Sequence, residues 1–256
     1  MAEVANAADP RWGQEGREEK AEAIFGTLRM HSSARLEEGT WLDLGCGSGG
    51  IAATLAGRVR RMVGVDPEPW QRWDGFRTDH ANLEFHVGTY ATLASILPPQ
   101  SVDVVICNQV YEHVDDAAAL LRAIRLVMKH EGICYFAGPN WLWPIEPHVF
   151  WPFVHWLPRT FAQRLMRSLG SSRADQLDAW PKSFWELTRL FRDAGLRHRV
   201  AIRARVLSGA RPGGRGGLIT DLMQRVPERI VNALSPFAPG FVFTLTHMPD
   251  DQARAD

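Results

Sequence analysis

The sequence has no excess of charge and no long apolar run, and each absence excludes a class of protein. Its 256 residues include 29 Lys and Arg against 29 Asp and Glu, so the formal net charge is zero. A nucleic-acid-binding protein needs a basic surface for phosphates, so nucleic acid is not an expected partner. No stretch approaches the roughly 18 apolar residues of a membrane span, and residues 1–20 lack the apolar core of a secretion signal. We therefore expect a cytoplasmic protein without a transmembrane segment.

Cysteine and tyrosine are also scarce. The three cysteines, Cys46, Cys107 and Cys134, lie far apart, which argues against a disulfide framework and against a cysteine zinc site. There are three tyrosines but ten tryptophans, and six of these tryptophans lie between Trp141 and Trp185. The aromatic residues are therefore concentrated in one segment of an otherwise ordinary globular composition.

Short apolar runs alternate with helical patterns through the first part of the chain. The runs cover residues 41–44, 62–65, 83–87, 102–107 and 133–137. The fourth run contains Val104–Cys107 without a polar residue, as expected for a strand covered on both faces. The strongest helical pattern covers Ala117–Lys129. The alternation predicts an α/β fold with a doubly wound parallel sheet.

The chain is expected to form one domain over residues 17–256, preceded by a flexible arm at residues 1–16. Beyond the fifth strand, the pattern predicts a helix over Ser183–Ala194, a strand over Arg199–Leu207 and a last strand over Phe241–Thr246. Between these parts, residues 141–180 form an aromatic, proline-punctuated insertion that is partly helical.

A glycine-rich segment, DLGCGSGG, follows the first predicted strand at Asp43–Gly50. Glycines at a strand-to-helix turn let the backbone approach a ligand, and the helix N-terminus offers amide donors to an anion. Gly45, Gly47 and Gly50 satisfy the dinucleotide spacing, and Asp66 follows Gly45 by 21 residues, near the distance of a ribose-binding acid. A nicotinamide-dependent oxidoreductase is therefore one interpretation.

Asp43 favours a different ligand. A carboxylate at the tip of the first strand repels a pyrophosphate but attracts a cation. S-adenosylmethionine carries an ammonium and a sulfonium group, and its ribose has two hydroxyls that Asp66 is placed to accept. A structural interpretation, in which Asp43 caps a turn and Asp66 caps the following helix, is the alternative.

Four motifs resemble those of class I S-adenosylmethionine-dependent methyltransferases, in particular the branch with the ubiquinone- and menaquinone-biosynthesis enzymes. They are LDLGCGSG at 42–49, VGVD at 63–66, DVV at 103–105 followed by VYEHV at 110–114, and RLVMKHEG at 125–132. In the last motif His130 and Glu131 replace the family's usual Pro and Gly. The resemblance implies a Rossmann-like seven-stranded sheet of order 3-2-1-4-5-7-6 whose last strand is antiparallel.

The resemblance also implies S-adenosyl-L-methionine as cofactor and assigns its contacts. The methionine portion would lie among the residues of the glycine loop, namely Asp43, Gly45, Cys46, Gly47 and Gly49. Asp66 would bind the ribose, Pro67 and Glu68 would lie beside the adenine, and Asn108 and Gln109 would flank the carboxypropyl side. Thr89 stands where the family usually has an acid that contacts the adenine amino group, so a threonine hydroxyl would replace that contact and Tyr90 would stack.

Three residues are candidates for acid–base catalysis. His113 follows the fourth strand, and Glu146 and His148 follow the fifth, where open α/β sheets hold substrate. Histidine titrates near neutrality and suits a general base. In the structural alternative, Glu112 is a hydrogen-bonding brace and His113 a packing residue. A metal site of two histidines and one carboxylate is disfavoured, since nothing in the spacing fixes coordination.

The insertion at residues 141–180 has three interpretations. Its aromatic residues form the core of a substrate lid, a pocket for an aromatic or lipid-like acceptor, or a surface for peripheral contact with a bilayer, where tryptophan is favoured. Four arginines in this part, Arg159, Arg164, Arg167 and Arg173, suit anionic headgroups or an acidic substrate, although such a run is often a solvated face.

We therefore expect methyl transfer from S-adenosylmethionine to a small-molecule acceptor, with a hydroxyl as the favoured acceptor group because the candidate bases are histidines. A non-catalytic S-adenosylmethionine-binding protein is the second alternative, beside the oxidoreductase. The sequence does not indicate an oligomeric state.

Overall fold

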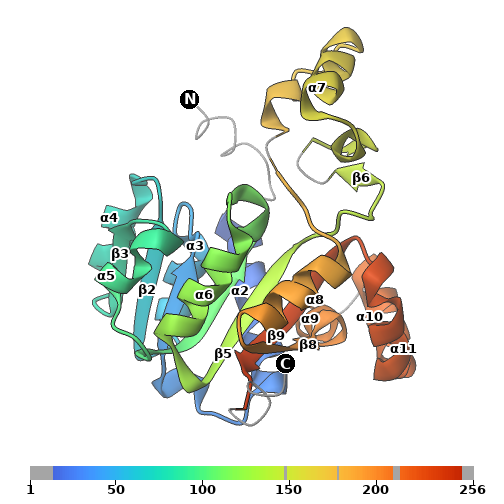
Figure 1. Cartoon of the computed structure of the whole chain (residues 1–256). Coiled ribbons are helices and arrows are strands. Elements are labelled where there is room, and N and C mark those ends of the chain that lie inside the picture. Colours follow the sequence, from blue (N-terminus) through green and yellow to red (C-terminus); the bar gives the residue numbers. More distant parts are fainter. Residues whose placement is uncertain (1–13, 147–148, 178, 210–213, 250–256) are drawn as a thin grey trace.

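The computed structural model describes residues 14–146, 149–177, 179–209 and 214–249, and its centre is a seven-stranded sheet (Figure 1). The strand order is β3-β2-β1-β4-β5-β9-β8. The strands are β1 (Thr40–Leu44), β2 (Arg61–Asp66), β3 (Leu83–Val87), β4 (Val102–Asn108), β5 (Met128–Pro139), β8 (Leu196–Val200) and β9 (Gly240–His247). Pairs from β3 to β5 are parallel, and β9 is antiparallel to β5 and β8. The predicted order 3-2-1-4-5-7-6, with an antiparallel last strand, is confirmed.

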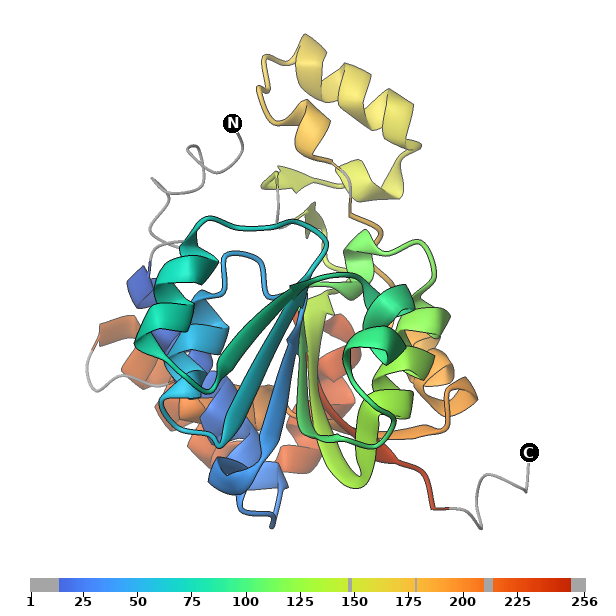
Figure 2. The same cartoon turned by 90° about the vertical axis from the view of Figure 1, so that its left-hand side faces the viewer.

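Helices cover both faces of the sheet, as Figure 2 shows. One layer contains α2 (Gln14–His31), α3 (Gly50–Ala56), α4 (Arg72–Asp79) and α9 (Ile202–Ser208), and the other contains α5 (Leu93–Ile96), α6 (Ala117–Val127) and α8 (Phe184–Asp193). Successive strand residues alternate between the two layers, so Val105 packs on the α6 side and Ile106 on the α3 side. Both faces are therefore apolar, which explains the strand runs without polar residues.

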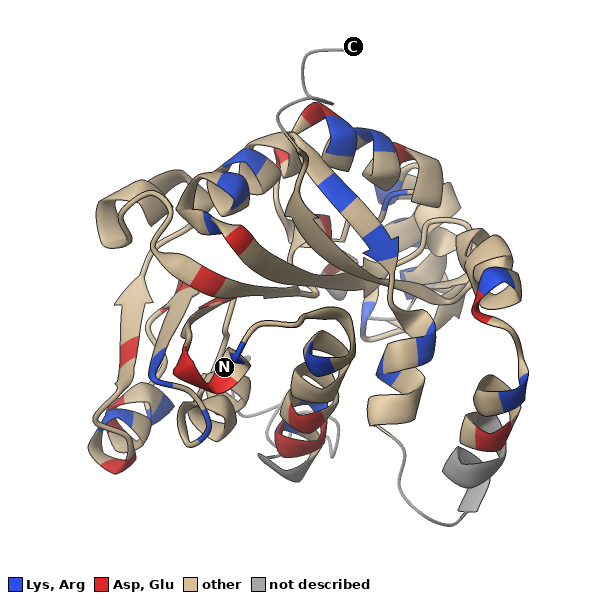
Figure 3. Ribbon diagram, turned by 90° about the horizontal axis from the view of Figure 1, so that it is seen from below, with Lys and Arg blue, Asp and Glu red and all other residues tan. Residues whose placement is uncertain are grey.

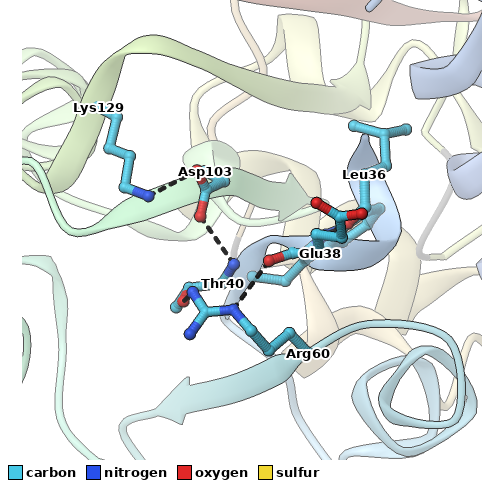
Figure 4. Close-up of polar contacts among 7 residues, drawn as sticks. Leu36, Glu38, Thr40, Arg60, Asp103 and Lys129 are labelled. Carbon is cyan, nitrogen blue, oxygen red and sulfur yellow. Dashed lines mark hydrogen bonds and ion pairs between the residues drawn. The ribbon is translucent and has the colours of Figure 1, made fainter. Parts of the chain in front are cut away.

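Side chains fasten the sheet at the amino ends of its strands (Figure 4). The Thr40 amide donates to Asp103 Oδ2 at 2.8 Å, and Lys129 Nζ lies 2.7 Å from Asp103 Oδ1. Close by, Arg60 Nε donates to the Glu38 carbonyl at 2.8 Å. These contacts occupy the end of the sheet away from the glycine loop, so the candidate site belongs to the carboxyl ends of the strands.

The insertion after β5 stands apart from the sheet, beyond the carboxyl ends of its strands (Figures 1 and 2). It contains β6 (Ile145–Glu146) paired with β7 (Trp151–Pro152), the short turn η5 (Val154–Trp156), helix α7 (Arg159–Ser168) and the turn η6 (Ala174–Gln176). Its own core is small and has no fully buried aromatic ring: Val149, Val154, Ala162, Met166, Ala174 and Leu177. The interpretation of the aromatic residues as a lid core is therefore wrong for most of them.

Other expectations met mixed outcomes. The strand predicted over Arg199–Leu207 is wrong beyond Val200, because β8 ends there and α9 begins at Ile202, where it packs on α2. The helix predicted over Ser183–Ala194 is confirmed as α8. Most of the predicted arm, residues 1–13, lies outside the described residues, and α2 already begins at Gln14. The remaining helices are α10 (Gly214–Arg225) and α11 (Glu228–Leu234).

Candidate cofactor and acceptor site

The glycine loop joins the end of β1 to the start of α3. The Gly45 and Cys46 amides both donate to the Val65 carbonyl, at 2.7 and 3.2 Å, so the loop is held against the end of β2. Gly45, Gly47 and Gly49 all have positive φ angles, of 76°, 53° and 84°. The backbone path therefore requires glycine at alternate positions, as the motif predicts.

Gly47 and Gly49 differ in what surrounds them. A Cβ at Gly49 would lie 2.6 Å from Phe85 Cζ, so this glycine is needed for packing inside the sheet layer. A Cβ at Gly47 would meet nothing within 4 Å. The backbone at Gly47 thus borders open space, which is the property expected where a ligand approaches the loop.

Asp43 lies in β1 between Gly64 of β2 and Ile106 of β4, and only 2% of its surface is exposed. Its Oδ2 atom is buried without a hydrogen-bond partner in the described part of the chain. Burial, and then the nearby Asp66 carboxylate, raise the pKa of Asp43 to about 7, while Arg17 lowers it. A buried acceptor without a donor is rare and costly, so this atom is suited to a ligand cation.

Arg17 brings a charge to this site that the motifs do not predict. It lies on α2, and burial lowers the pKa of its guanidinium while the Asp43 carboxylate opposes that shift. The sequence shows Arg17 only as part of a polar helix start. Its approach to Asp43 depends on where α2 packs against the sheet, which no local pattern specifies.

Asp66 ends β2 and accepts three hydrogen bonds. The Gly47 amide donates to Oδ2 at 2.7 Å, and the Glu68 amide and Trp70 Nε1 donate to Oδ1 at 3.2 and 3.1 Å. Pro67 is exposed beside it. The acid predicted to bind ribose therefore also ties the glycine loop to the chain after β2. Trp70 was missed, although its position four residues after Asp66 was visible in the sequence.

The remaining predicted cofactor residues differ in placement. Asn108 ends β4, and Gln109 follows with a φ of 60°, its amide donating to the Ala137 carbonyl at 2.8 Å. Both lie at the same sheet edge as Asp43. Thr89 is exposed and caps the turn η3 (Tyr90–Thr92), because its hydroxyl accepts from the Ala91 amide at 3.2 Å. The structure thus shows a local capping role for this threonine.

Two other residues of the predicted set are partly or wholly used in packing. Tyr90 is half-buried against the apolar cluster on the α6 side of the sheet. Cys46 is buried in the α3 side, and burial raises the pKa of its thiol well above the usual value. Cys46 is therefore a packed thiol and not a nucleophile.

The turn η4 (Tyr111–His113) connects the sheet edge to the insertion. The Tyr111 hydroxyl donates to the Pro139 carbonyl at the end of β5, and the Trp180 amide donates to the Glu112 carbonyl at 2.6 Å. Glu112 is completely buried, whereas His113 is exposed. The bond to Trp180 uses the Glu112 backbone, so a bracing role of the Glu112 carboxylate stays a prediction, and the His113 side chain is accessible at the ligand edge.

The other two candidate bases are only partly described. Glu146 lies in β6, but its side chain and the whole of His148 lie outside the described residues. Within the described residues, no group of three His, Cys, Asp or Glu side chains is arranged to hold a metal ion.

Aromatic side chains gather where the insertion leaves β5. Trp156 Nε1 donates to the Trp141 carbonyl at 2.7 Å, and the Trp141 and Phe153 rings lie 6.1 and 5.1 Å from the Trp156 ring. All three rings are at least 40% exposed. We call these three residues the basal aromatic cluster. Such a cluster offers flat apolar surface, with the Trp156 indole donor already bonded to the Trp141 carbonyl.

The residues present fit S-adenosylmethionine. An unpartnered buried carboxylate oxygen suits its cationic groups, the open space at Gly47 leaves room beside the loop, and Asp66 accepts hydrogen bonds of the kind a diol donates. A pyrophosphate would instead meet the carboxyl group of Asp43. The geometry therefore agrees with the motif-based choice of ligand.

Comparison with known proteins gives the class. Residues 42–136 match the family model described as a methyltransferase domain. Together with the strand order and the glycine loop, this match shows that the chain is similar over residues 42–136 to class I S-adenosylmethionine-dependent methyltransferases. The resemblance inferred from the motifs is confirmed, and the oxidoreductase alternative is not favoured.

The relatives place the chain near the predicted branch. The ubiquinone biosynthesis O-methyltransferase of Neisseria meningitidis serogroup C (strain 053442) is 31% identical over 148 residues, which cover 55% of this chain and 61% of that protein. The chain thus spans about three fifths of the length of such curated relatives. In the part of the chain that the structure describes, no helix is long and apolar enough to cross a membrane.

Solved structures share the fold at low sequence identity. The Burkholderia thailandensis 1,6-didemethyltoxoflavin-N1-methyltransferase, solved with bound 1,6-didemethyltoxoflavin and S-adenosylhomocysteine, has a TM-score of 0.55 at 14% identity, covering 97% of this chain and 86% of that chain. The YcgJ protein of Bacillus subtilis has a TM-score of 0.53 at 15% identity, covering 89% of this chain and 98% of that chain. The common feature is the methyltransferase fold.

Proposed function

We propose that this protein transfers a methyl group from S-adenosylmethionine to a hydroxyl group of a small molecule whose body is aromatic or lipid-like. The observation that carries the proposal is the buried, unpartnered Oδ2 of Asp43 at the glycine loop. The choice of a hydroxyl acceptor is supported by relatives named ubiquinone biosynthesis O-methyltransferase.

The cofactor side of the site is assigned to the sheet edge. Asp43 holds the cationic methionine portion beside Gly45, Gly47 and Gly49, and Asp66 accepts the ribose hydroxyls. Pro67, Thr89 and Tyr90 border the adenine, and Asn108 and Gln109 flank the carboxypropyl side. When bound, S-adenosylmethionine supplies a methyl group activated by its sulfonium. The residues of this chain bind and orient it, and in-line positioning contributes about 7–11 kcal/mol in favourable cases.

The acceptor side is assigned to the residues after β4 and β5. His113, exposed on η4, serves as the general base that takes the proton from the acceptor hydroxyl; Glu146 and His148 stay sequence-based candidates for acid–base catalysis, since their side chains lie outside the described residues. The basal aromatic cluster of Trp141, Phe153 and Trp156 binds the apolar body of the acceptor, since its rings are exposed beside the end of β5. The insertion at residues 141–180 thereby acts as the substrate lid.

The test has two stages. Isothermal titration of the protein with S-adenosylmethionine and with NAD first measures which ligand binds, and we expect binding only of S-adenosylmethionine. Incubation of a metabolite extract with S-adenosylmethionine labelled in the methyl group then identifies the methylated product by mass spectrometry. Preferential binding of NAD would contradict the cofactor assignment. Cofactor binding without transfer to any hydroxylated, aminated or carbon acceptor would instead identify a non-catalytic binding protein.

A further inference from the structure

The far part of the insertion exposes apolar side chains that the site does not use. In helix α7 and at its end, Phe161 is 56% and Leu169 is 64% exposed, and Leu157, just before the helix, is 36% exposed. The opposite side of α7 packs Ala162 and Met166 into the core of the insertion. The helix is therefore packed on one side, and these apolar side chains are exposed on the other. We call Leu157, Phe161, Arg164, Arg167 and Leu169 the tip surface.

The charge around the tip surface is mainly positive. Residues 147–174 contain four arginines, namely Arg159, Arg164, Arg167 and Arg173, and no Asp or Glu, in a chain whose net charge is zero. Arg167 is paired with Asp175. Arg159, Arg164 and Arg173 form no ion pair with any residue that the structure describes. Figure 3, which views the opposite end of the molecule, shows acidic and basic residues interspersed over its helices.

The position of α7 in the molecule also favours contact with a large flat surface. α7 lies at the far end of the insertion from the sheet, on the side of the molecule that holds the carboxyl ends of the strands (Figures 1 and 2). A flat surface that touched α7 would therefore face the edge that contains Asp43 and Asp66, and the sheet would not obstruct the contact. Nine of the seventeen large apolar side chains that are exposed in the described residues lie within residues 141–180.

We propose that the tip surface docks this protein on an anionic lipid bilayer, with the apolar side chains in the headgroup region and the arginines on the lipid phosphates. An interfacial helix needs an apolar face flanked by cations, and both are present on α7 and its ends. Arg159, Arg164 and Arg173, which pair with no acid that the structure describes, complement an anionic leaflet, where each basic residue contributes about fivefold to binding. The proposal does not depend on the methyl transfer reaction.

The test is co-sedimentation of the full chain with vesicles of phosphatidylcholine alone and with vesicles that also contain phosphatidylglycerol. We expect binding to the anionic vesicles only, and its loss near 1 M salt, where the screening length is about 3 Å. Phe161→Glu combined with Leu169→Glu should lower the partition coefficient by about tenfold or more, because a charge in the interface is unfavourable. Arg164→Glu, which reverses one charge, should lower it by about tenfold.

Matched variants outside the insertion control for surface charge. Phe237→Glu changes an apolar side chain that is 63% exposed, and Arg192→Glu changes an exposed arginine on α8. Neither should alter vesicle binding, and circular dichroism checks that every variant is folded. The proposal is overturned by absence of binding to anionic vesicles, by equal effects of the controls, or by a polyanion preference. A polyanion preference would be seen as binding to duplex DNA as tight as binding to anionic vesicles. Arg164→Glu would remove that binding, and the apolar variants would leave it unchanged.

Discussion

The sheet domain and the insertion use aromatic residues in opposite ways. In the sheet, Trp41, Phe136 and Phe243 are at most 1% exposed and pack between the strands and the helices. In the insertion, Phe153 and Trp156 are 51% and 43% exposed, above a core of small aliphatic side chains. The difference teaches that the aromatic surplus of this sequence does not stabilise the fold. It lies on surface, where the acceptor and the bilayer are proposed to bind.

His113→Ala has the largest expected effect and separates chemistry from cofactor binding. General-base catalysis contributes about 10²–10⁴-fold, so kcat should fall by that factor. The dissociation constant for S-adenosylmethionine, measured by calorimetry, should be unchanged because His113 lies on η4 and not on the glycine loop. An unchanged kcat would assign the proton transfer to another group. His130→Ala serves as the control, because His130 lies near the amino end of β5, away from the candidate site.

Truncation of buried side chains should show that the two regions are stabilised separately. Ile124 is completely buried in α6, so Ile124→Ala should lower the free energy of unfolding of the whole domain by about 2–5 kcal/mol. Met166→Ala, in the small core of the insertion, should raise amide exchange within residues 149–177 and leave exchange in β1 and β4 unchanged. Equal loss of protection in both regions would mean that they unfold as one unit.

Asp43→Asn should weaken S-adenosylmethionine binding by about 100-fold, because it removes a buried negative charge that faces the ligand cation. Calorimetry measures the change, and Asp74→Asn, on the exposed surface of α4, is the matched control. An affinity within about twofold of the original protein would contradict the placement of the methionine portion.

The same variant should change the pH dependence of stability. The pKa of Asp43 is raised from 3.8 to about 7 in the folded protein, so between these values the folded state holds a proton that the unfolded chain has released. The contribution of Asp43 to the free energy of unfolding therefore decreases as pH rises from about 4 to about 7 and is constant above that. At pH 8 the Asp43→Asn variant should therefore be more stable than the original protein, and this difference in stability should vanish near pH 4. Thermal melts without ligand measure it.

Trp156→Ala has the smallest expected effect and tests the insertion alone. It removes one exposed ring of the basal aromatic cluster, so the KM for the acceptor should rise by about tenfold while the affinity for S-adenosylmethionine stays the same. Trp185→Ala, on α8 and 56% exposed, is the control. A loss of cofactor affinity on Trp156→Ala would show that the insertion also covers the cofactor side.

Much of the sheet could be predicted from local pattern, because buried strands such as β4 read as continuous apolar runs. The strand order came from the resemblance, since periodicity does not specify which strands are neighbours. The strand predicted over Arg199–Leu207 failed because arginine and apolar residues alternate there over too short a span to separate the two periods. Contact of α9 with α2 decides the helix, and that contact is not local.

The candidate site shows the same division. Asp43, Asp66 and the glycines could be located from the sequence because a βα turn places them at one edge. Arg17 could not, since it reaches Asp43 through the packing of α2. The exposure of the aromatic residues in the insertion was equally unpredictable, because a sequence rich in Trp and Phe suits a core as well as a surface.

The three donors on Asp66 have a thermodynamic consequence. A carboxylate offers about four acceptor positions, and in the described residues Gly47, Glu68 and Trp70 occupy three of them. One hydroxyl of a ribose diol can therefore be accepted directly, but the second would compete with one of these three donors. Recognition of the diol is then largely an exchange of one hydrogen bond for another. A single-hydroxyl analogue should therefore lose little affinity at this acid.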